Sequence, residues 1–224
     1  MIHRPRAMVF DWDNTLVDSW ECIQVATNAT LRHMGHPEWS MEETRRRVAH
    51  SLRDAFPVLF GDRWEEARDH FYATFEAVHM DYLRPLPDAR AMLDEMRELG
   101  IVLAVVSNKT GRYLRAEAER LGWEDLFHKM IGATDAPEDK PSAAPVHMAL
   151  AASGVAPGPA VWFIGDAPID MACAANSGCL PVLLRNAALQ QGEFDTHPPR
   201  RHILGCKELA ALVRDLAAPA PQVG

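Results

Sequence analysis

The chain has 224 residues, 48% of them hydrophobic, and its 23 Lys and Arg against 31 Asp and Glu give a formal net charge of −8. This length suits one domain with a large insertion, or two small domains. The acidity disfavours a nucleic-acid partner, and no stretch approaches the roughly 18 to 20 apolar residues of a membrane span. No apolar signal segment follows the basic residues 1–6, so we expect a cytoplasmic protein with no membrane partner.

Five short apolar runs have the character of buried parallel strands. In chain order they are residues 7–10, 101–106, 129–131, 160–164 and 180–184. Helical patterns lie between several of them, at residues 88–99, 111–121, 142–153 and 168–177. We expect Asp88 to be the N-cap of the first of these helices. The alternation predicts an α/β fold with a doubly wound, mostly parallel sheet, whose ligands bind beyond the carboxyl ends of the strands.

A long helical stretch interrupts the alternation after the first strand. Residues 18–83 contain no convincing strand, although a parallel crossover needs only about a dozen residues. Turn signals flank the stretch at Asp18-Ser19 and at Pro85-Leu86-Pro87. We therefore predict a core domain of residues 1–17 and 84–224 and an inserted helical domain of residues 18–83.

Two pairs of acids follow two of the predicted strands. Asp11 and Asp13 come directly after the first strand, and Asp166 and Asp170 follow the strand at residues 160–164. Four acids that converge on one crevice repel one another, so the cluster is tolerated mainly around a cation. Because all-oxygen ligands favour magnesium over zinc or copper, we expect a Mg²⁺ site there.

Other predicted strand ends carry groups that bind phosphate. Ser107 and Asn108 end the strand at residues 101–106, and Lys140 precedes a predicted helix. A hydroxyl, amide hydrogens and an ammonium group suit the oxygens of a phosphate. The neighbouring Lys109 is expected to point to solvent, and Trp12, between the first two acids, is expected to pack rather than to touch a substrate.

In this order, the motifs resemble the signature of the haloacid dehalogenase-like superfamily, which reads Asp-x-Asp-x-Thr, Ser/Thr, Lys and Gly-Asp-x-x-x-Asp. In this chain they are residues 11–15, Ser107, Lys140 and residues 165–170. The resemblance covers nearly the whole chain and is greatest to phosphoglycolate phosphatase-type members, through residues 14–19 and 51–56. It implies a Rossmann-like core, a helical cap at residues 18–83 and a phosphatase acting on a small phosphorylated metabolite.

The resemblance also implies roles for the acids. Asp11 would be the nucleophile that forms an aspartyl-phosphate, and Asp13 would act first as general acid and then as general base. Mg²⁺ would be held by a carboxylate oxygen of Asp11, the backbone carbonyl of Asp13 and Asp166. Asp170 would act behind these ligands, through water or through Lys140, whose ammonium would balance charge in the transition state.

The remaining implied residues contact phosphate or substrate. Ser107 with the Asn108 amide, and Asn14 in the first motif, would hold phosphoryl oxygens. Asn14 replaces the usual glycine, but asparagine tolerates the left-handed backbone conformation. In the insertion, His50 and Arg53 lie where relatives contact the leaving group, and a solvated helix face is about equally expected there.

Two other functions stay open. A phosphomutase could use the same scaffold, and a non-catalytic phosphoacceptor module also needs acids, a hydroxyl and a lysine around magnesium. Phosphonate hydrolases of the family need a cap lysine, and residues 18–83 contain none. Either a monomer or a homodimer fits the sequence.

Overall fold

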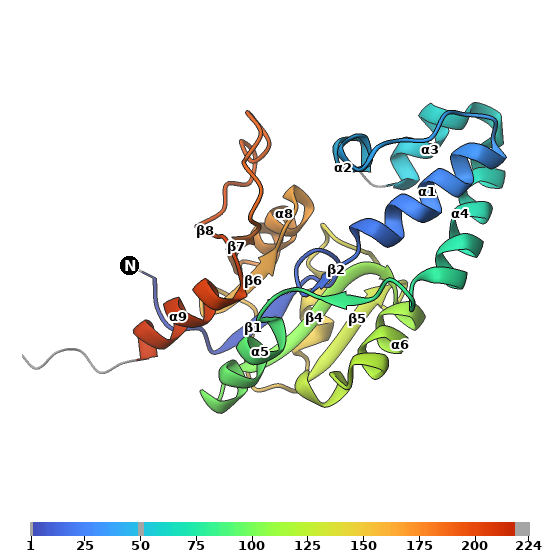
Figure 1. The fold of residues 1–224 in the computed structure, drawn as a ribbon. Coiled ribbons are helices and arrows are strands. Elements are labelled where there is room, and N and C mark those ends of the chain that lie inside the picture. The colour runs from blue at the N-terminus through green and yellow to red at the C-terminus, as the bar shows by residue number, and fades with distance from the viewer. Residues whose placement is uncertain (1, 49–51, 218–224) are drawn as a thin grey trace, which may run out of the picture. The chain divides into compact units, whose positions relative to one another are not determined.

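The computed structural model describes residues 2–48 and 52–217 (Figure 1). The chain divides into two compact units. One comprises Met1–Val17 and Pro85–Gly224, and the other comprises Asp18–Arg84. The second unit is therefore a single insertion into the first, just after the first strand and its loop.

The first unit is built on a six-stranded sheet in which every strand pair is parallel. Its strands, in the order β5-β4-β1-β6-β7-β8, are β5 (Lys129–Ala133), β4 (Val102–Thr110), β1 (Ala7–Phe10), β6 (Val161–Gly165), β7 (Leu180–Leu184) and β8 (Arg201–Ile203). The chain runs outward from β1 through β4 and β5, and then continues on the other side of β1. The predicted α/β fold is confirmed, and the topology places a crevice beyond the carboxyl end of β1.

Five of the strands correspond to the predicted apolar runs, and β8 does not. Its three residues, Arg-His-Ile, form no apolar run. In the structure Arg201 is exposed and only Ile203 is buried. The strand exists because it pairs with β7, which aligns Leu184 with Ile203. An edge strand with one buried side chain gives too weak a pattern to be predicted from sequence.

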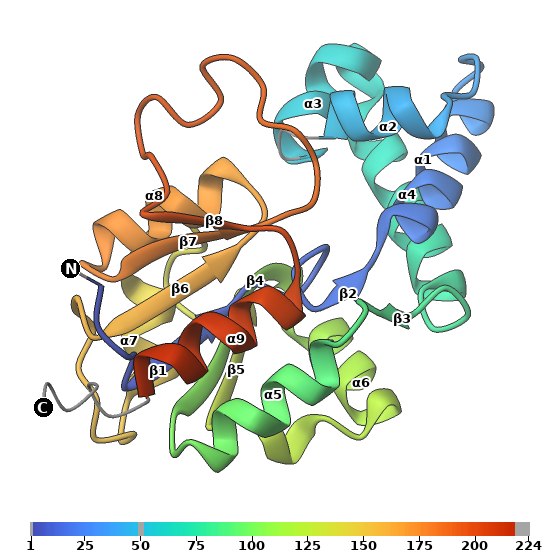
Figure 2. The ribbon, with the colours of Figure 1, turned by 60° about the vertical axis from the view of Figure 1, so that its left-hand side comes forward.

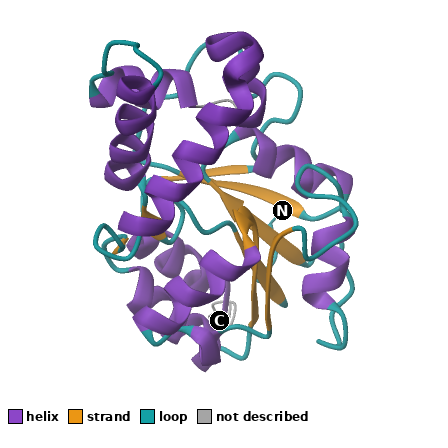
Figure 3. Ribbon diagram, turned by 90° about the vertical axis from the view of Figure 1, so that its right-hand side faces the viewer, coloured by secondary structure: helices purple, strands orange, loops and turns teal. Residues whose placement is uncertain are grey.

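Helices cover both faces of this sheet (Figure 3). They are α5 (Ala89–Glu98), α6 (Gly111–Leu121), α7 (Ala144–Leu150), α8 (Pro168–Asn176) and α9 (Cys206–Ala217). Val146 of α7 and Cys173 of α8 belong to one buried cluster with Val9 and Phe163 of the sheet. The helices α5 and α9 pack against each other (Figure 2). The strands are thus buried on both sides, as their continuous apolar sequences require.

The start of α5 differs in part from its prediction. Asp88 does occupy the position before the helix, but its φ is +61° and its side chain makes no capping hydrogen bond. Asp88 is therefore the N-cap residue, as predicted, but it lacks the side-chain hydrogen bond of an ordinary N-cap. An aspartate in the left-handed region reverses the chain direction here, which is a second reason for finding this residue type before a helix.

The second unit is helical. It contains α1 (Trp20–His33), α2 (Met41–Val48), α3 (Leu52–Phe60), the 3₁₀ turn η1 (Gly61–Arg63) and α4 (Trp64–Val78). Phe71 on α4 packs edge-on against Phe56 and stacks on Phe75. The short strands β2 (Val17–Asp18) and β3 (Arg84–Pro85) pair where the chain passes between the units. Within residues 2–48 and 52–217, no helix is both long and apolar enough to cross a membrane.

Candidate active site

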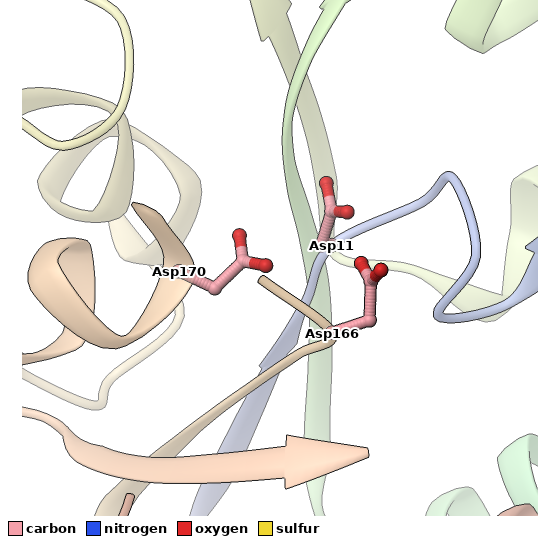
Figure 4. Close-up of side chains that lie close together, drawn as sticks. All are labelled: Asp11, Asp166 and Asp170. Atoms are coloured by element: carbon pink, nitrogen blue, oxygen red, sulfur yellow. The ribbon is translucent and has the colours of Figure 1, made fainter. Parts of the chain in front are cut away.

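Three carboxylates meet where β1 and β6 end (Figure 4). Asp11 follows β1, and its backbone N–H donates to the carbonyl of Ile164 on β6 at 2.8 Å. Asp166 follows β6, and Asp170 lies in the first turn of α8. One carboxylate oxygen from each acid lies within 4.8 Å of the other two. Among the described residues, these acids form the one group of three or more side chains that could hold a metal ion.

A glycine allows Asp170 to reach this position. A Cβ atom on Gly165 would lie 2.3 Å from the Cβ, Cγ and Oδ2 atoms of Asp170, so a side chain at residue 165 would displace the carboxylate. Asp170 Oδ2 also accepts a hydrogen bond from the Ala167 N–H at 3.0 Å. The helix begins at Pro168, where the missing N–H costs nothing. Local sequence thus fixes this carboxylate without help from a ligand.

The ammonium group of Lys140 joins two of the acids. Its Nζ lies 2.7 Å from Asp11 Oδ1 and 2.7 Å from Asp170 Oδ1, and the residue is buried. Asn108 holds the backbone of Lys140, because its Oδ1 accepts from the Lys140 N–H at 3.0 Å and its Nδ2 donates to the Lys140 carbonyl at 3.1 Å. The side-chain amide of Asn108 therefore fixes Lys140, and a phosphate contact from Asn108 would come from its backbone N–H.

The electrostatics of the site favour a divalent cation. Burial raises the pKa of Asp11 to about 6, because the attraction of Lys140 offsets it only in part. Loss of solvation, with repulsion from Asp170 and Asp11, raises the pKa of Asp166 well above its ordinary value. Burial acts to lower the pKa of Lys140, but Asp11 and Asp170 outweigh it and raise that pKa. Lys140 is bonded to only two of the three carboxylates, and the attraction of Lys140 and Arg185 does not outweigh the causes that raise the pKa of Asp166. A cluster of incompletely neutralised oxygen ligands is the chemistry that Mg²⁺ accepts.

Asp13 lies beside a different cation. Of the four predicted acids, the structure brings three within 4.8 Å of one another and pairs the fourth with Lys109. Asp13 Oδ1 lies 2.7 Å from Lys109 Nζ. The prediction that Lys109 points to solvent is wrong, since its side chain is only 6% exposed.

The residue that holds Lys109 in place is Glu117 on α6. Lys109 Nζ donates to both carboxylate oxygens of Glu117, at 2.7 and 2.6 Å. Trp12 packs as expected, fully buried and edge-on to Trp123, and its Nε1–H also donates to Glu117 Oε2 at 2.7 Å. Sequence reasoning missed Glu117, because a glutamate within an amphipathic helix normally faces water.

The remaining motif residues lie on the loops around the acids. Ser107 is buried, and its Oγ accepts from the Lys109 N–H at 3.2 Å. Asn14 has a φ of +60°, the left-handed conformation expected of this residue in place of glycine. Thr15 Oγ1 donates to Asp166 Oδ1 at 3.3 Å, so the first motif is bonded directly to the last.

The two predicted substrate contacts in the insertion cannot be placed beside these groups. His50 lies outside the described residues. Arg53 belongs to α3, but its side chain is outside what the structure describes. Both residues stay predictions.

Known proteins of one family are similar to this chain. Residues 8–183 match the family model described as haloacid dehalogenase-like hydrolase. The chain is 30% identical over 190 residues to a phosphoglycolate phosphatase of Neisseria meningitidis, covering 81% of this chain and 80% of the relative. It is 29% identical over 186 residues to one of Chromobacterium violaceum, covering 79% and 83%. A haloacid dehalogenase-like family hydrolase of Streptococcus pneumoniae has the same fold, with a TM-score of 0.82, 24% identity and coverage of 93% and 98%.

Proposed function

The chain belongs to the haloacid dehalogenase-like hydrolase family and is a phosphatase, and from this premise we propose that it hydrolyses a small phosphomonoester with Mg²⁺ through an aspartyl-phosphate. The observation that carries the proposal is the group of Asp11, Asp166 and Asp170 around the ammonium of Lys140. A carboxylate nucleophile, an oxygen-lined cation site and a fixed ammonium are the parts that phosphoryl transfer needs. The names of the curated relatives make phosphoglycolate the first substrate to test.

The acids at the strand ends would divide between the nucleophile and the metal site. Asp11 and Asp166 would hold Mg²⁺ with carboxylate oxygens, and Asp13 with its backbone carbonyl. Asp170 would support them through Lys140, to which it is hydrogen-bonded at 2.7 Å. When bound, the cation screens the repulsion between an anionic nucleophile and an anionic phosphoryl group. Lys140, bonded to Asp11 Oδ1, orients that carboxylate and adds a second positive charge.

The reaction would proceed in two steps that use Asp13 in opposite directions. In the first, a carboxylate oxygen of Asp11 attacks phosphorus, the bond to the leaving oxygen breaks, and Asp13 gives that oxygen a proton. In the second, Asp13 takes a proton from water as the water oxygen attacks the aspartyl-phosphate. Inorganic phosphate leaves and the Asp11 carboxylate is restored, so protons and bonds balance over the cycle.

Other groups would bind the substrate and shield it. The Ser107 hydroxyl, the Asn108 backbone N–H and Asn14 would hold phosphoryl oxygens. The helical unit would be the cap that excludes bulk water during turnover, with His50 and Arg53 as its substrate contacts. We further propose a cytoplasmic enzyme, either monomeric or homodimeric.

The test is a phosphate-release panel of phosphoglycolate, sugar phosphates and nucleoside monophosphates, with Mg²⁺ and with EDTA. Asp11→Asn should abolish turnover, whereas Asp215→Asn, an exposed acid on α9, should leave it unchanged. Equal turnover by the wild type and Asp11→Asn would refute the mechanism. Absence of turnover with every monoester would instead favour a phosphoacceptor module, and stable phosphorylation of Asp11 by a phosphodonor would identify it.

Replacing Asp13 separates acid and base chemistry from metal binding. We expect Asp13→Asn to lose nearly all turnover, because an amide can neither give nor take the proton. It should still bind Mg²⁺, since the proposed ligand from this residue is its backbone carbonyl. Isothermal titration with Mg²⁺, run beside the kinetic assay, checks both statements. Near-wild-type turnover would show that another group moves the proton.

A further inference from the structure

Four side chains beside the acid cluster form a connected series of hydrogen bonds and ion pairs. The two-step reaction proposed above uses only one of them, Asp13. The series runs from Asp13 to Lys109, from Lys109 to Glu117, and from Glu117 to Trp12. Each contact is between 2.6 and 2.7 Å. Trp12 and Asp13 belong to the loop after β1, Lys109 to β4 and Glu117 to α6. Three separate elements therefore meet at one ammonium group.

Burying these charged groups costs desolvation free energy, so their position calls for an explanation. The side chains of Lys109 and Glu117 are only 6% and 2% exposed, so both charges have left water. Two carboxylates share one ammonium, and they keep the pKa of Lys109 raised even though burial acts to lower it. Replacing a buried ion pair by well-packed apolar side chains is often neutral or stabilising. Stability alone is thus a weak reason to place these charges here.

The neighbours of Lys109 suggest what it does instead. Asp13 is the partially solvated end of this series of side chains, and its own side chain is 25% exposed. Glu117 is held in turn by the indole of Trp12, the residue immediately before Asp13. The ammonium is therefore fixed from behind by a buried carboxylate and meets the one carboxylate whose direction matters for proton transfer.

We infer that Lys109, anchored by Glu117, is a positioning residue that holds the carboxylate of Asp13 in its place for proton transfer. The inference rests on the proposed function, and it adds two residues to the machinery of that site. Lys109 touches Asp13 rather than the phosphate, so it acts through Asp13. Misplacing a reacting group by about 1 Å can cost about a hundredfold in rate. Loss of Lys109 should therefore weaken the steps that need Asp13 and spare those that do not.

The leaving group distinguishes positioning from a merely structural role. An alkyl phosphate such as phosphoglycolate expels a basic alkoxide, which needs a proton from Asp13. The leaving group of p-nitrophenyl phosphate is stable as an anion and needs little or none. A variant with a damaged fold loses kcat/KM for both substrates equally, whereas a variant with a misplaced Asp13 loses it mainly for the alkyl phosphate. The ratio of the two kcat/KM values therefore reports positioning, because it does not depend on the fraction of folded enzyme.

The experiment compares Lys109→Met with Lys109→Arg, which keeps the charge, and with Lys129→Met, a lysine at the far end of the neighbouring strand β5. Lys109→Met should lower kcat/KM about ten- to a hundredfold for the alkyl phosphate and less than about fivefold for p-nitrophenyl phosphate. Lys109→Arg should recover part of this loss, and Lys129→Met should match the wild type.

Glu117→Gln covers the case in which Lys109→Met does not fold. A glutamine still accepts from Trp12 and Lys109 but removes the second negative charge, so we expect a smaller loss with the same substrate preference. Glu119→Gln, exposed on the same helix, is its control. Suppose that the variants lose activity equally for both substrates, or for neither, while turnover still depends on Asp11. That result would overturn the positioning role of Lys109 and leave the proposed function intact. A wild type that hydrolyses neither substrate, or an active Asp11→Asn, would overturn the proposed function and this inference with it.

Discussion

Replacing the proposed nucleophile by its neutral isostere should stabilise the metal-free protein while it abolishes activity. In the folded chain, burial raises the pKa of Asp11 from 3.8 to about 6, since the attraction of Lys140 only partly compensates. That difference corresponds to about 3 kcal/mol by which folding disfavours the ionised carboxylate at neutral pH. Asparagine resembles the protonated acid and avoids the cost. At about 2 to 4 °C per kcal/mol, Asp11→Asn should raise the Tm in EDTA by about 6 to 12 °C.

The pH dependence gives the sign of this effect a second test. Because the folded state holds its proton up to a higher pH than the unfolded chain, the wild type loses stability as pH rises from 3.8 toward 6. The loss is complete above that range. The advantage of Asp11→Asn should therefore be small at about pH 4 and largest at pH 7 and above, where the wild-type carboxylate is charged in both states.

The assay is thermal unfolding of both proteins by differential scanning calorimetry between pH 4 and 8, in EDTA and then with saturating Mg²⁺. Magnesium should raise the wild-type Tm more than that of Asp11→Asn, because the wild type supplies one more charged ligand. Asp215→Asn serves as the control, since it makes the same substitution at an exposed position on α9. A Tm for Asp11→Asn below that of the wild type at pH 7.5 in EDTA would refute the electrostatic reasoning.

Two further substitutions test how the site is held together. Asn108→Ala removes both hydrogen bonds to the backbone of Lys140, so we expect a loss of about 1 to 3 kcal/mol in unfolding free energy and a kcat at least about tenfold lower. Asn176→Ala, which removes a bond to the adjacent Pro141 carbonyl, should cost much less kcat, and an equal loss would contradict a specific role for Asn108. Gly165→Ala should displace Asp170, destabilise the fold by about 1 to 3 kcal/mol and weaken Mg²⁺ binding in a titration. Gly205→Ala is its control, because a Cβ there meets no atom within 4 Å, and unchanged Mg²⁺ affinity in Gly165→Ala would refute the role of the clash.

The acid cluster could be predicted because two independent regularities point to the same place. Short apolar runs place strands at residues 7–10 and 160–164, and parallel strands end at the same edge of a sheet. The register aligns Phe10 with Ile164, so the residues that follow them meet. No knowledge of side-chain packing is needed for this step. Asp170 follows as well, because it lies within the first turn of a helix whose start is marked by Pro168.

The contacts of Asn108 could not be predicted, because they depend on a loop. Its side chain bonds the backbone of Lys140, 32 residues further along the chain. No periodic pattern covers the segment between β5 and α7, so its path is determined by tertiary packing. The same holds for β8, which has a single buried side chain and can be identified as a strand only from its pairing with β7.

Lys109 is a different case, because the sequence does contain a signal for it. The chain has only four lysines among its 23 basic residues, and the other 19 are arginines. Two of the four lysines, Lys109 and Lys140, have buried side chains, and each ammonium bridges two carboxylates. A compact ammonium with three rotatable donors differs from the wide, planar fork of donors on an arginine guanidinium, so the two cations are not interchangeable between two carboxylates. In a chain that otherwise uses arginine, a lysine next to a motif is therefore better interpreted as part of the site than as a solvated side chain.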